Sequence, residues 1–190
     1  MNIFNYFQQI KLTKDQSEAV EKLYNFLLGD ERVFILQGYA GSGKTTLLKG
    51  VVAYLKSIEK TYQLMAPTGR AAKVINQKTG FESTTVHKGI YSFEELHEIE
   101  RSSEKSDVSF LYQYMLRNNS EMQDAVFIVD EASMVSDRLS EGEFFRFGSG
   151  YLLKDLIAFS RVQDSSKKSK IIFIGDPAQL PPIGMNFSPA

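Results

Sequence analysis

The sequence has 190 residues, the size of one large domain or of one domain with an insertion. Its 22 lysine and arginine residues balance 23 aspartate and glutamate residues, so a net charge of −1 excludes a protein that binds polyanions through overall charge. Cysteine is absent, which excludes disulfide bonds, thiolate metal sites and thiol catalysis. The apolar stretches are too short to cross a bilayer and the first residues do not form a signal peptide, so we expect an intracellular, cytoplasmic protein with no membrane partner.

Four short apolar runs predict strands that are covered on both faces, because each run is nearly continuous instead of alternating with polar residues. They span residues 33–36, 63–66, 126–129 and 171–174. Helical patterns lie before and between them. Thr13 followed by Gln16 at the third helical position forms a capping box for a first helix. Residues 45–58 and 69–76 are predicted to form two more helices. This alternation predicts an α/β fold with a mostly parallel sheet.

The segment at residues 93–119 departs from this alternation. Residues 94–107 contain six acidic and two basic residues, and the strand-like residues 109–115 follow them. We interpret the segment as a small insertion on the main sheet, helical at first and then extended. A second polar stretch, residues 163–170, is predicted to be an exposed loop before the last strand. Packing is favoured over base stacking for the aromatic residues Phe81, Tyr91, Phe93, Phe110, Tyr112 and Tyr114.

A phosphate-binding loop is the strongest motif in the chain. Residues 38–45 fit the pattern G-x-x-x-x-G-K-[ST] between a predicted strand and a predicted helix. Its glycines allow backbone N–H groups to converge on a phosphate chain, and the helix adds its positive N-terminal end. We expect Lys44 to reach the β- and γ-phosphates and the Thr45 hydroxyl to bind Mg²⁺.

Two further motifs follow later strands, where the carboxyl ends of a parallel sheet collect ligands. Asp130 and Glu131 come directly after the third run, and we expect Asp130 to hold the metal and Glu131 to deprotonate the attacking water. Gln179 lies after the fourth run, in a loop that ends in two prolines. Its amide is suited to detect the γ-phosphate and the water beside it.

In this order, the motifs resemble the N-terminal motor domain of superfamily-1 DNA helicases of the RecD-like, 5′-to-3′ type. Residues 12–16 resemble the glutamine motif, whose amide reads the adenine edge. Residues 38–45 resemble motif I, residues 66–73 resemble motif Ia, and residues 84–87 resemble the adjacent single-strand contact motif. Residues 130–134 resemble motif II, and residues 175–182 resemble motif III. The resemblance implies a RecA-like P-loop NTPase fold, a three-layer sandwich over residues 1–190, with the inserted segment as an accessory element that helps to part the strands.

The resemblance also implies ATP and Mg²⁺ as cofactors and single-stranded DNA as a partner. The implied catalytic residues are Lys44, Glu131 and Gln179, and the implied metal ligands are Thr45 and Asp130. The implied nucleotide-binding residues are Gln16, Gly38, Gly41, Ser42, Gly43, Lys44, Thr45 and Thr46. The implied DNA contacts are Pro67, Thr68, Gly69, Arg70, Thr85 and His87. Contacts of this kind bind the backbone and do not distinguish DNA from RNA. The expectation that the partner is DNA therefore depends on the resemblance.

The resemblance stops at motif III, and we expect the second RecA-like motor domain, with the arginine that completes the ATPase site, to be absent from these 190 residues. An arginine of that kind accounts for about 10³ to 10⁵ in rate. The isolated chain is therefore expected to be nearly inactive until a second motor domain, or the subunits of a recombination complex, complete it. Two alternatives stay open: a nucleotide-switch module that does not unwind DNA, and a P-loop kinase, which the lack of an arginine-rich lid disfavours.

Overall fold

A five-stranded parallel sheet with strand order β1-β8-β6-β2-β3 forms the centre of the structure. The computed structural model describes residues 2–102, 108–179 and 189. The sheet comprises β1 (Val33–Gln37), β2 (Tyr62–Ala66), β3 (Thr84–Thr85), β6 (Val126–Val129) and β8 (Lys170–Gly175). Each neighbouring pair runs parallel, which confirms the four predicted strands and brings their carboxyl ends to one edge.

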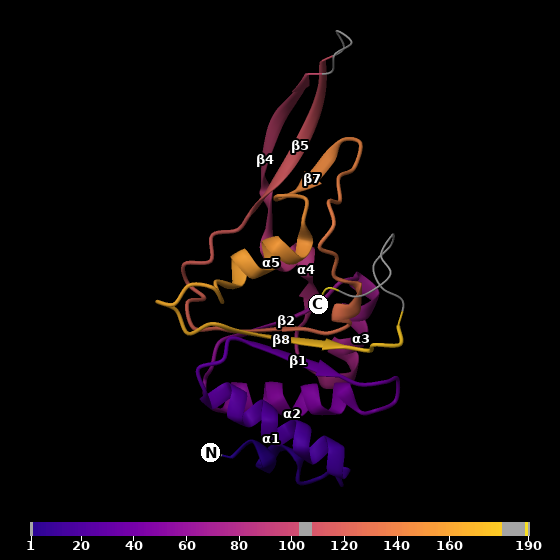
Figure 1. Cartoon of the computed structure of the whole chain (residues 1–190), viewed down its shortest axis with the longest axis vertical. Helices are drawn as coiled ribbons and strands as arrows, with labels where there is room; N and C mark the ends of the chain where they lie inside the picture. The colour runs from indigo at the N-terminus through magenta and orange to yellow at the C-terminus, as the bar shows by residue number, and fades with distance from the viewer. Residues whose placement is uncertain (1, 103–107, 180–188, 190) are drawn as a thin grey trace.

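Helices cover both faces of this sheet, and Figure 1 shows the resulting layers. One face packs against α1 (Lys14–Leu28), α2 (Lys44–Ser57) and α3 (Gly69–Thr79) and the other against α4 (Val86–Ile90) and α5 (Leu152–Ser160). The described residues also form two 3₁₀ helices, η1 (Ile3–Phe7) and η2 (Ala132–Met134). The predicted three-layer α/β sandwich is confirmed. Within the described residues, no helix has the length and hydropathy of a membrane span.

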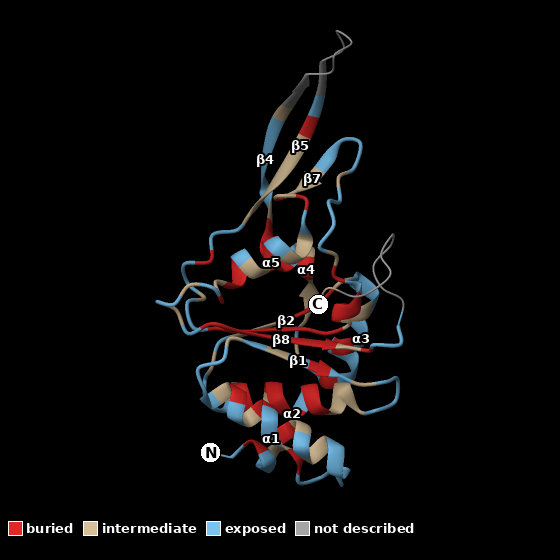
Figure 2. Ribbon diagram, viewed as in Figure 1, coloured by how far each residue is buried: buried red, intermediate tan, exposed pale blue. Residues whose placement is uncertain are grey.

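Alternate residues of the central strands enter two separate apolar cores. In β8, Ile172 and Ile174 join the core beneath α1 and α2, whereas Ile171 and Phe173 join the core beneath α5. Side chains alternate between the two faces of a strand, so a strand with helices on both sides has to be apolar at every position. Figure 2 shows that burial is concentrated in these central strands.

β1 differs from the predicted strand that is covered on both faces. Leu36 is buried, but Val33 and Ile35 are 46% and 53% exposed. β1 lies at the edge of the sheet, and neither of these two residues takes part in the core beneath α4 and α5. The helices on that side do not reach the edge strand, so the apolar run is buried on one face alone.

A second sheet projects from the α4 and α5 side of the sandwich (Figure 1). β4 (Tyr91–Ser102) and β5 (Val108–Leu116) pair antiparallel, and β7 (Phe145–Phe147) joins β5 in parallel. The predicted helix is therefore wrong up to Ser102, and residues 103–107 lie outside the described part. The predicted extended half is confirmed as β5, and the third strand comes from outside residues 93–119.

Stacked aromatic rings explain why the acidic segment is a strand. The ring of Phe93 in β4 lies 5.1 Å from that of Tyr114 in β5. Tyr114 stacks in turn on Phe147 in β7, with ring centroids 4.9 Å apart and planes inclined by 15°. At the base of β4, the buried Tyr91 hydroxyl donates to Asp155 Oδ2 at 2.7 Å. The predicted packing role is confirmed for Tyr91 and Tyr114, whereas Phe93 contacts neighbouring rings but stays 50% exposed.

The predicted exposed loop at residues 163–170 is wrong at its last two positions, because Ser169 and Lys170 are both buried. Lys170 is 6% exposed, and its Nζ donates to the carbonyls of Phe26, Gly29 and Glu31, each at 2.7 Å. Carbonyls at a helix C-terminus have no partner within the helix, and Lys170 supplies one. Burial lowers the pKa of the Lys170 ammonium. The residue therefore ties the end of α1 to the start of β8.

Candidate nucleotide-binding site

The phosphate loop runs from the end of β1 into α2. Gly41 and Gly43 have φ angles of +79° and +90°, in the left-handed region that favours glycine. The Gly38 N–H donates to the Gly175 carbonyl at 3.1 Å, which fastens the loop to the end of β8. Gly43 is the N-cap of α2 and has no side-chain cap. The first N–H groups of α2 are therefore available to an anion.

Lys44 lies folded against its own loop. Its Nζ donates to the carbonyls of Gly38 and Tyr39, the latter at 3.0 Å, and lies 3.8 Å from Asp176 Oδ2. Asp176 is buried at the carboxyl end of β8. The sequence did not single out Asp176, although it follows its strand in the same way that Asp130 follows β6. Its carboxylate and the two carbonyls hold the ammonium at the base of the loop.

The acidic pair combines a buried carboxylate with a strained backbone. Asp130 is 6% exposed and accepts the Glu131 N–H at 3.0 Å. Burial raises the pKa of Asp130 from 3.8 to about 6, the charge of Glu131 adds to the rise, and Lys44 and Lys78 oppose it. Glu131 has a φ of +54°, a left-handed conformation that costs a non-glycine residue about 1 to 2 kcal/mol. Backbone strain of this kind is often found at functional sites, although Glu59 and Arg161 have similar φ angles of +54° and +55°.

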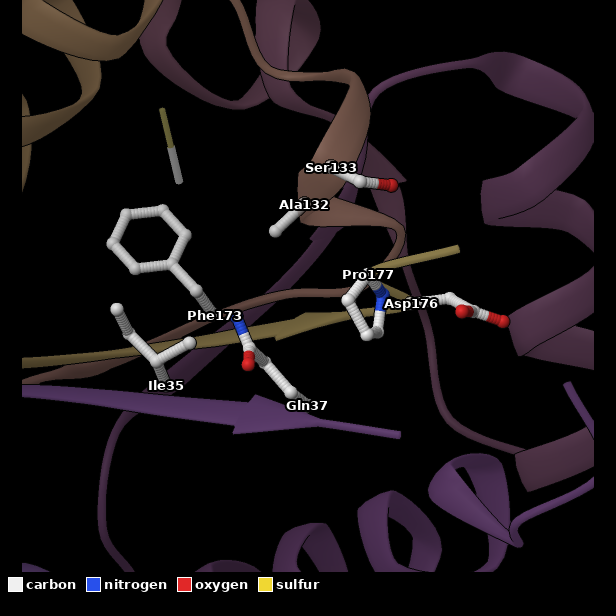
Figure 3. Close-up of a pocket in the computed structure, with 8 residues that line it drawn as sticks. Ile35, Gln37, Ala132, Ser133, Phe173, Asp176 and Pro177 are labelled. Carbon is white, nitrogen blue, oxygen red and sulfur yellow. The ribbon is translucent and has the colours of Figure 1, made fainter. Parts of the chain in front are cut away.

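Gln179 approaches the acidic pair from the loop after β8. Its N–H donates to the Asp176 carbonyl at 3.1 Å, and Ser133 Oγ donates to Gln179 Oε1 at 3.4 Å. Figure 3 shows the oxygens of Ser133 and Asp176 on one side, away from the apolar side chains of Ile35 and Phe173. The two loops after β6 and β8 are therefore joined by side-chain contacts. The last motif III positions, 180–182, lie outside the described residues.

These loops enclose a cavity of about 640 Å³. Its lining residues are Ile10, Ala40, Gly41, Gly43, Lys44, Thr45, Thr46, Lys49, Lys78, Asp130, Glu131 and Gln179. The cavity thus brings together eight predicted residues from three loops. It also includes two lysines, Lys49 and Lys78, that no motif indicated. Gly38 and Ser42 belong to the loop but not to this lining.

The amide of Gln16 lies beside the cavity and contacts backbone. Its Oε1 accepts the Thr13 N–H at 3.0 Å, and its Nε2 donates to the Ser42 carbonyl at 2.9 Å. The first bond completes the predicted capping box of α1. The second bond joins α1 to the phosphate loop, a contact that the sequence did not indicate.

The predicted DNA contacts begin two helices. Thr68 Oγ1 accepts the Ala71 N–H at 3.2 Å at the start of α3, and Thr85 Oγ1 accepts the Lys88 N–H at 3.1 Å at the start of α4. β2 and β3 pair in parallel, so these two ends lie at one edge of the sheet. Pro67 and Gly69 flank the first of them. Each hydroxyl oxygen acts as an acceptor in these bonds, so its own proton can still be donated to another group.

Thr68 and Arg70 line a second cavity of about 260 Å³. Thr45, Lys78, Asp130 and Glu131 line it as well, so the two cavities adjoin along the acidic pair. His87 lies elsewhere: its ring packs 4.9 Å from Phe147 and 5.8 Å from Tyr91. Burial lowers the pKa of His87, so it carries no positive charge to a phosphate at neutral pH.

The donors present fit a magnesium–nucleotide complex. The described residues contain no group of three or more His, Cys, Asp or Glu side chains that could hold an ion by themselves. One hydroxyl, Thr45, and one carboxylate, Asp130, line the cavity beside a loop that is open to phosphate. Mg²⁺ in proteins is usually held in this way, by one or two oxygen side chains together with phosphate oxygens and water.

Comparison with known protein families supports the motif assignment. The family described as AAA domain matches residues 11–142, which is more than half of the sequence. The chain belongs to this family. The matched residues include the phosphate loop, the helices α2 and α3 that line the cavities, and the acidic pair, and they end before β8.

Relatives of this AAA domain include helicase proteins. The chain is 30% identical to the RecBCD enzyme subunit RecD of Buchnera aphidicola from Schizaphis graminum, and the alignment covers 96% of the chain and 28% of that protein. It is 28% identical to the ATP-dependent RecD2 DNA helicase of Deinococcus radiodurans, over 91% of the chain and 19% of that protein. The chain thus spans less than a third of either relative.

A solved structure shares the fold of this AAA domain. The Pif1 helicase from Candida albicans superposes with a TM-score of 0.54 and 17% identity, covering 92% of the chain and 34% of that protein. Together with the RecD relatives, this confirms the resemblance to a superfamily-1, RecD-like helicase motor domain with a RecA-like fold.

Proposed function

We propose that this domain is the N-terminal motor half of an ATP-dependent DNA helicase. It binds ATP–Mg²⁺ and single-stranded DNA, and it hydrolyses ATP to drive translocation when a second motor domain completes it. The observation that carries this proposal is the junction of the two cavities. The phosphate loop, Asp130, Glu131 and Gln179 surround the larger one, and Thr68 and Arg70 line the one that adjoins it.

The phosphate loop binds the triphosphate. Backbone N–H groups at the start of α2 donate to the phosphate oxygens, and the helix dipole favours their negative charge. Lys44 exchanges the carbonyls of Gly38 and Tyr39 for the β- and γ-phosphates, which are stronger partners for an ammonium. Thr45 and Asp130 hold Mg²⁺, which neutralises charge on the phosphates.

Glu131 and Gln179 act at the γ-phosphate end. Glu131 accepts a proton from the attacking water, and both it and Asp130 line the cavity. Gln179 donates its amide N–H to the γ-phosphate, because Ser133 is the donor to its oxygen. Loss of the γ-phosphate releases Gln179, and the loop after β8 shifts with it.

DNA binding is coupled to nucleotide binding because some residues line both cavities. Thr68, Thr85 and the Arg70 guanidinium hold backbone phosphates, together with the N–H groups at the start of α3. Thr45, Asp130 and Glu131 line both cavities, so a nucleotide in one changes the charge that faces the other. Single-stranded DNA affinity should therefore depend on bound nucleotide.

The proposal is tested by the binding of a fluorescent dT oligonucleotide, measured by anisotropy with and without the Mg²⁺ complex of a non-hydrolysable ATP analogue. We expect the analogue to change the affinity at least about fivefold, a coupling of about 1 kcal/mol. Lys44→Ala should remove this dependence and keep the nucleotide-free affinity. Equal affinity with and without the analogue would instead favour a binding module without motor activity.

Glu131→Gln separates binding from hydrolysis. The substitution keeps the size of the side chain and removes the group that accepts the proton, so the analogue should bind as in the unmodified chain. Turnover of ATP, followed by phosphate release, should fall by about 10² or more. Normal turnover in Glu131→Gln would show that another group deprotonates the water.

A further inference from the structure

Asp176 is a buried carboxylate that joins the loop after β8 to the phosphate loop. Its side chain is 3% exposed. Oδ1 accepts the Ala178 N–H at 2.9 Å, and the backbone carbonyl accepts the Gln179 N–H at 3.1 Å. Oδ2 lies 3.8 Å from Lys44 Nζ. The same residue therefore contacts the lysine that is expected to bind phosphate and the turn that carries Gln179.

The contact between Asp176 and Lys44 acts through charge and not through a hydrogen bond. Its length of 3.8 Å exceeds the donor–acceptor distances of hydrogen bonds, which are about 2.7 to 3.2 Å. The direction of the ammonium is fixed instead by the carbonyls of Gly38 and Tyr39, to which Lys44 Nζ donates. Asp176 therefore adds attraction at this position, whereas the two carbonyls supply the geometry.

Phosphate binding places a second anion beside the same ammonium. Under the proposed function, Lys44 exchanges its loop oxygens for the β- and γ-phosphates. The buried carboxylate of Asp176 then loses part of the positive charge that compensates it, and an uncompensated buried charge is strongly unfavourable. The triphosphate therefore has to compete with Asp176 for Lys44, and this competition lowers the affinity for the nucleotide.

We propose that Asp176 is a positioning residue that competes with the phosphates for Lys44 and so weakens the binding of nucleoside triphosphate and diphosphate. This inference rests on the proposed function, because it assumes that the larger cavity binds a nucleotide. It assigns to Asp176 a part in product release. When ADP leaves, the ammonium returns to Asp176, so ADP dissociates faster than it would beside a neutral residue.

Asp176→Asn separates the charge of this residue from its contacts in the loop. Asparagine keeps the size of the side chain and an oxygen for the Ala178 N–H, and it removes the negative charge beside Lys44. Calorimetry measures the affinities of the Mg²⁺ complexes of a non-hydrolysable ATP analogue and of ADP. Stopped-flow fluorescence of a labelled ADP measures its dissociation. We expect each affinity to rise at least about fivefold and ADP to dissociate more slowly by a similar factor.

The direction of the change separates this proposal from a structural role. Replacement of a residue that only supports the loop should weaken nucleotide binding, whereas removal of a competing charge should strengthen it. The ratio of the affinities of Asp176→Asn and the unmodified chain should also persist at about 1 M salt, because a buried pair is screened much less than surface charges.

Asp155→Asn is the matched control. Asp155 is also 3% exposed, but it accepts the Tyr91 hydroxyl at 2.7 Å and lies outside the lining of both cavities. The affinities of the folded variant for the ATP analogue and for ADP should stay within about twofold of those of the unmodified chain.

Asp176→Ser provides a second test if circular dichroism shows that the asparagine variant is unfolded. A serine hydroxyl also accepts a backbone N–H in this kind of turn, and it carries no charge. The same rise in both affinities is expected.

Unchanged or weaker nucleotide binding in the folded variant would overturn the inference. Unfolding of both variants would overturn it as well, because the carboxylate would then be structural. Failure of the unmodified chain to bind either the ATP analogue or ADP would contradict the proposed function instead, so the two failures are distinguishable.

Discussion

The ammonium of Lys44 is surrounded by oxygen atoms of two neighbouring loops. Its ammonium lies among two loop carbonyls and the buried carboxylate of Asp176. All three partners belong to the loops after β1 and β8, and none belongs to an apolar core. Under the proposed function, we therefore expect the ammonium to reach a phosphate by exchanging oxygen partners, without any change in the packing of the sheet.

Lys44→Ala should strongly weaken nucleotide binding and leave the fold intact. A charge-assisted contact to the phosphates is lost, and we expect the affinity for ATP–Mg²⁺ to fall by about 100-fold, as measured by calorimetry. Circular dichroism should show an unchanged helix and strand content. An unfolded variant would show that the bond to Asp176 supports the loops and that Lys44 is structural.

The buried carboxyl of Asp130 makes stability depend on pH. Its pKa is raised to about 6 by burial, so between about pH 4 and pH 6 the folded protein retains a proton that the unfolded chain releases. The stabilising contribution is present below pH 4 and is lost as the pH rises through 6. Urea unfolding should show this loss, about 3 kcal/mol at most, in the unmodified chain.

Asp130→Asn is the control for that measurement, because an amide does not titrate. The difference in unfolding free energy between the variant and the unmodified chain should grow with pH between 4 and 7. Parallel pH profiles for the two proteins would contradict the assignment of the titration to Asp130.

Most of the candidate site was readable from the sequence at the level of residues. Asp130 and Glu131 follow β6 directly, and Lys44 and Thr45 begin α2 after the glycine-rich loop that follows β1. Parallel pairing brings the ends of those strands together without further information. Lys78 could not be found in this way. It is one of several exposed lysines, and only the packing of α3 against the sheet decides that it faces the cavity.

At the scale of elements, α3 joins the two cavities. Thr68 and Arg70 at its start line the smaller cavity, and Lys78 near its end lines both. The charge of Lys78 also lowers the pKa of Asp130. A shift of this helix would therefore move Arg70, a predicted DNA contact, together with Lys78, which lines the nucleotide cavity. Such a shift is a physical route for the proposed coupling.

Lys78→Met should weaken ATP–Mg²⁺ binding about threefold to tenfold. The substitution keeps an unbranched side chain and removes a positive charge that faces the phosphates and the acidic pair, an interaction that is partly screened at an exposed position. Calorimetry at low and high salt measures the effect, which should shrink at high salt. The matched control is Lys22→Met, which removes an exposed lysine from α1, outside the lining of both cavities. Equal affinities in the two variants would exclude a role for Lys78.

The sequence did not predict β4, because contacts between separate strands decide its conformation. Residues 94–102 contain four glutamates and few apolar residues, so the local pattern favours an exposed helix. The strand is instead fixed by its pairing with β5 and by rings such as Phe147, more than 50 positions along the chain from Phe93. Local patterns do not contain that information, whereas the buried strands carry it in their own apolar runs.

At the scale of the molecule, the predicted nucleotide residues gather around one of the two sheets. The parallel sheet carries them at its carboxyl edge or in α1 beside it, whereas the second sheet, formed by β4, β5 and β7, stands on α4 and α5 (Figure 1). His87 and Tyr91 pack against Phe147, so this contact links the base of the second sheet to α4, the helix that follows Thr85.

The chemistry of the whole site sets the rate that these 190 residues can reach alone. In the described part, the cavity lining supplies three lysines but no arginine. An arginine delivered by a second domain contributes about 10³ to 10⁵ in comparable phosphoryl-transfer enzymes, whose intrinsic turnover is on the order of 10⁻³ s⁻¹ without it. We expect phosphate release from ATP at about that rate or below, with less than twofold stimulation by a dT oligonucleotide. DNA-stimulated turnover of about 1 s⁻¹ in this chain would show that its own residues complete the site, and would remove the need for a second motor domain from the proposal.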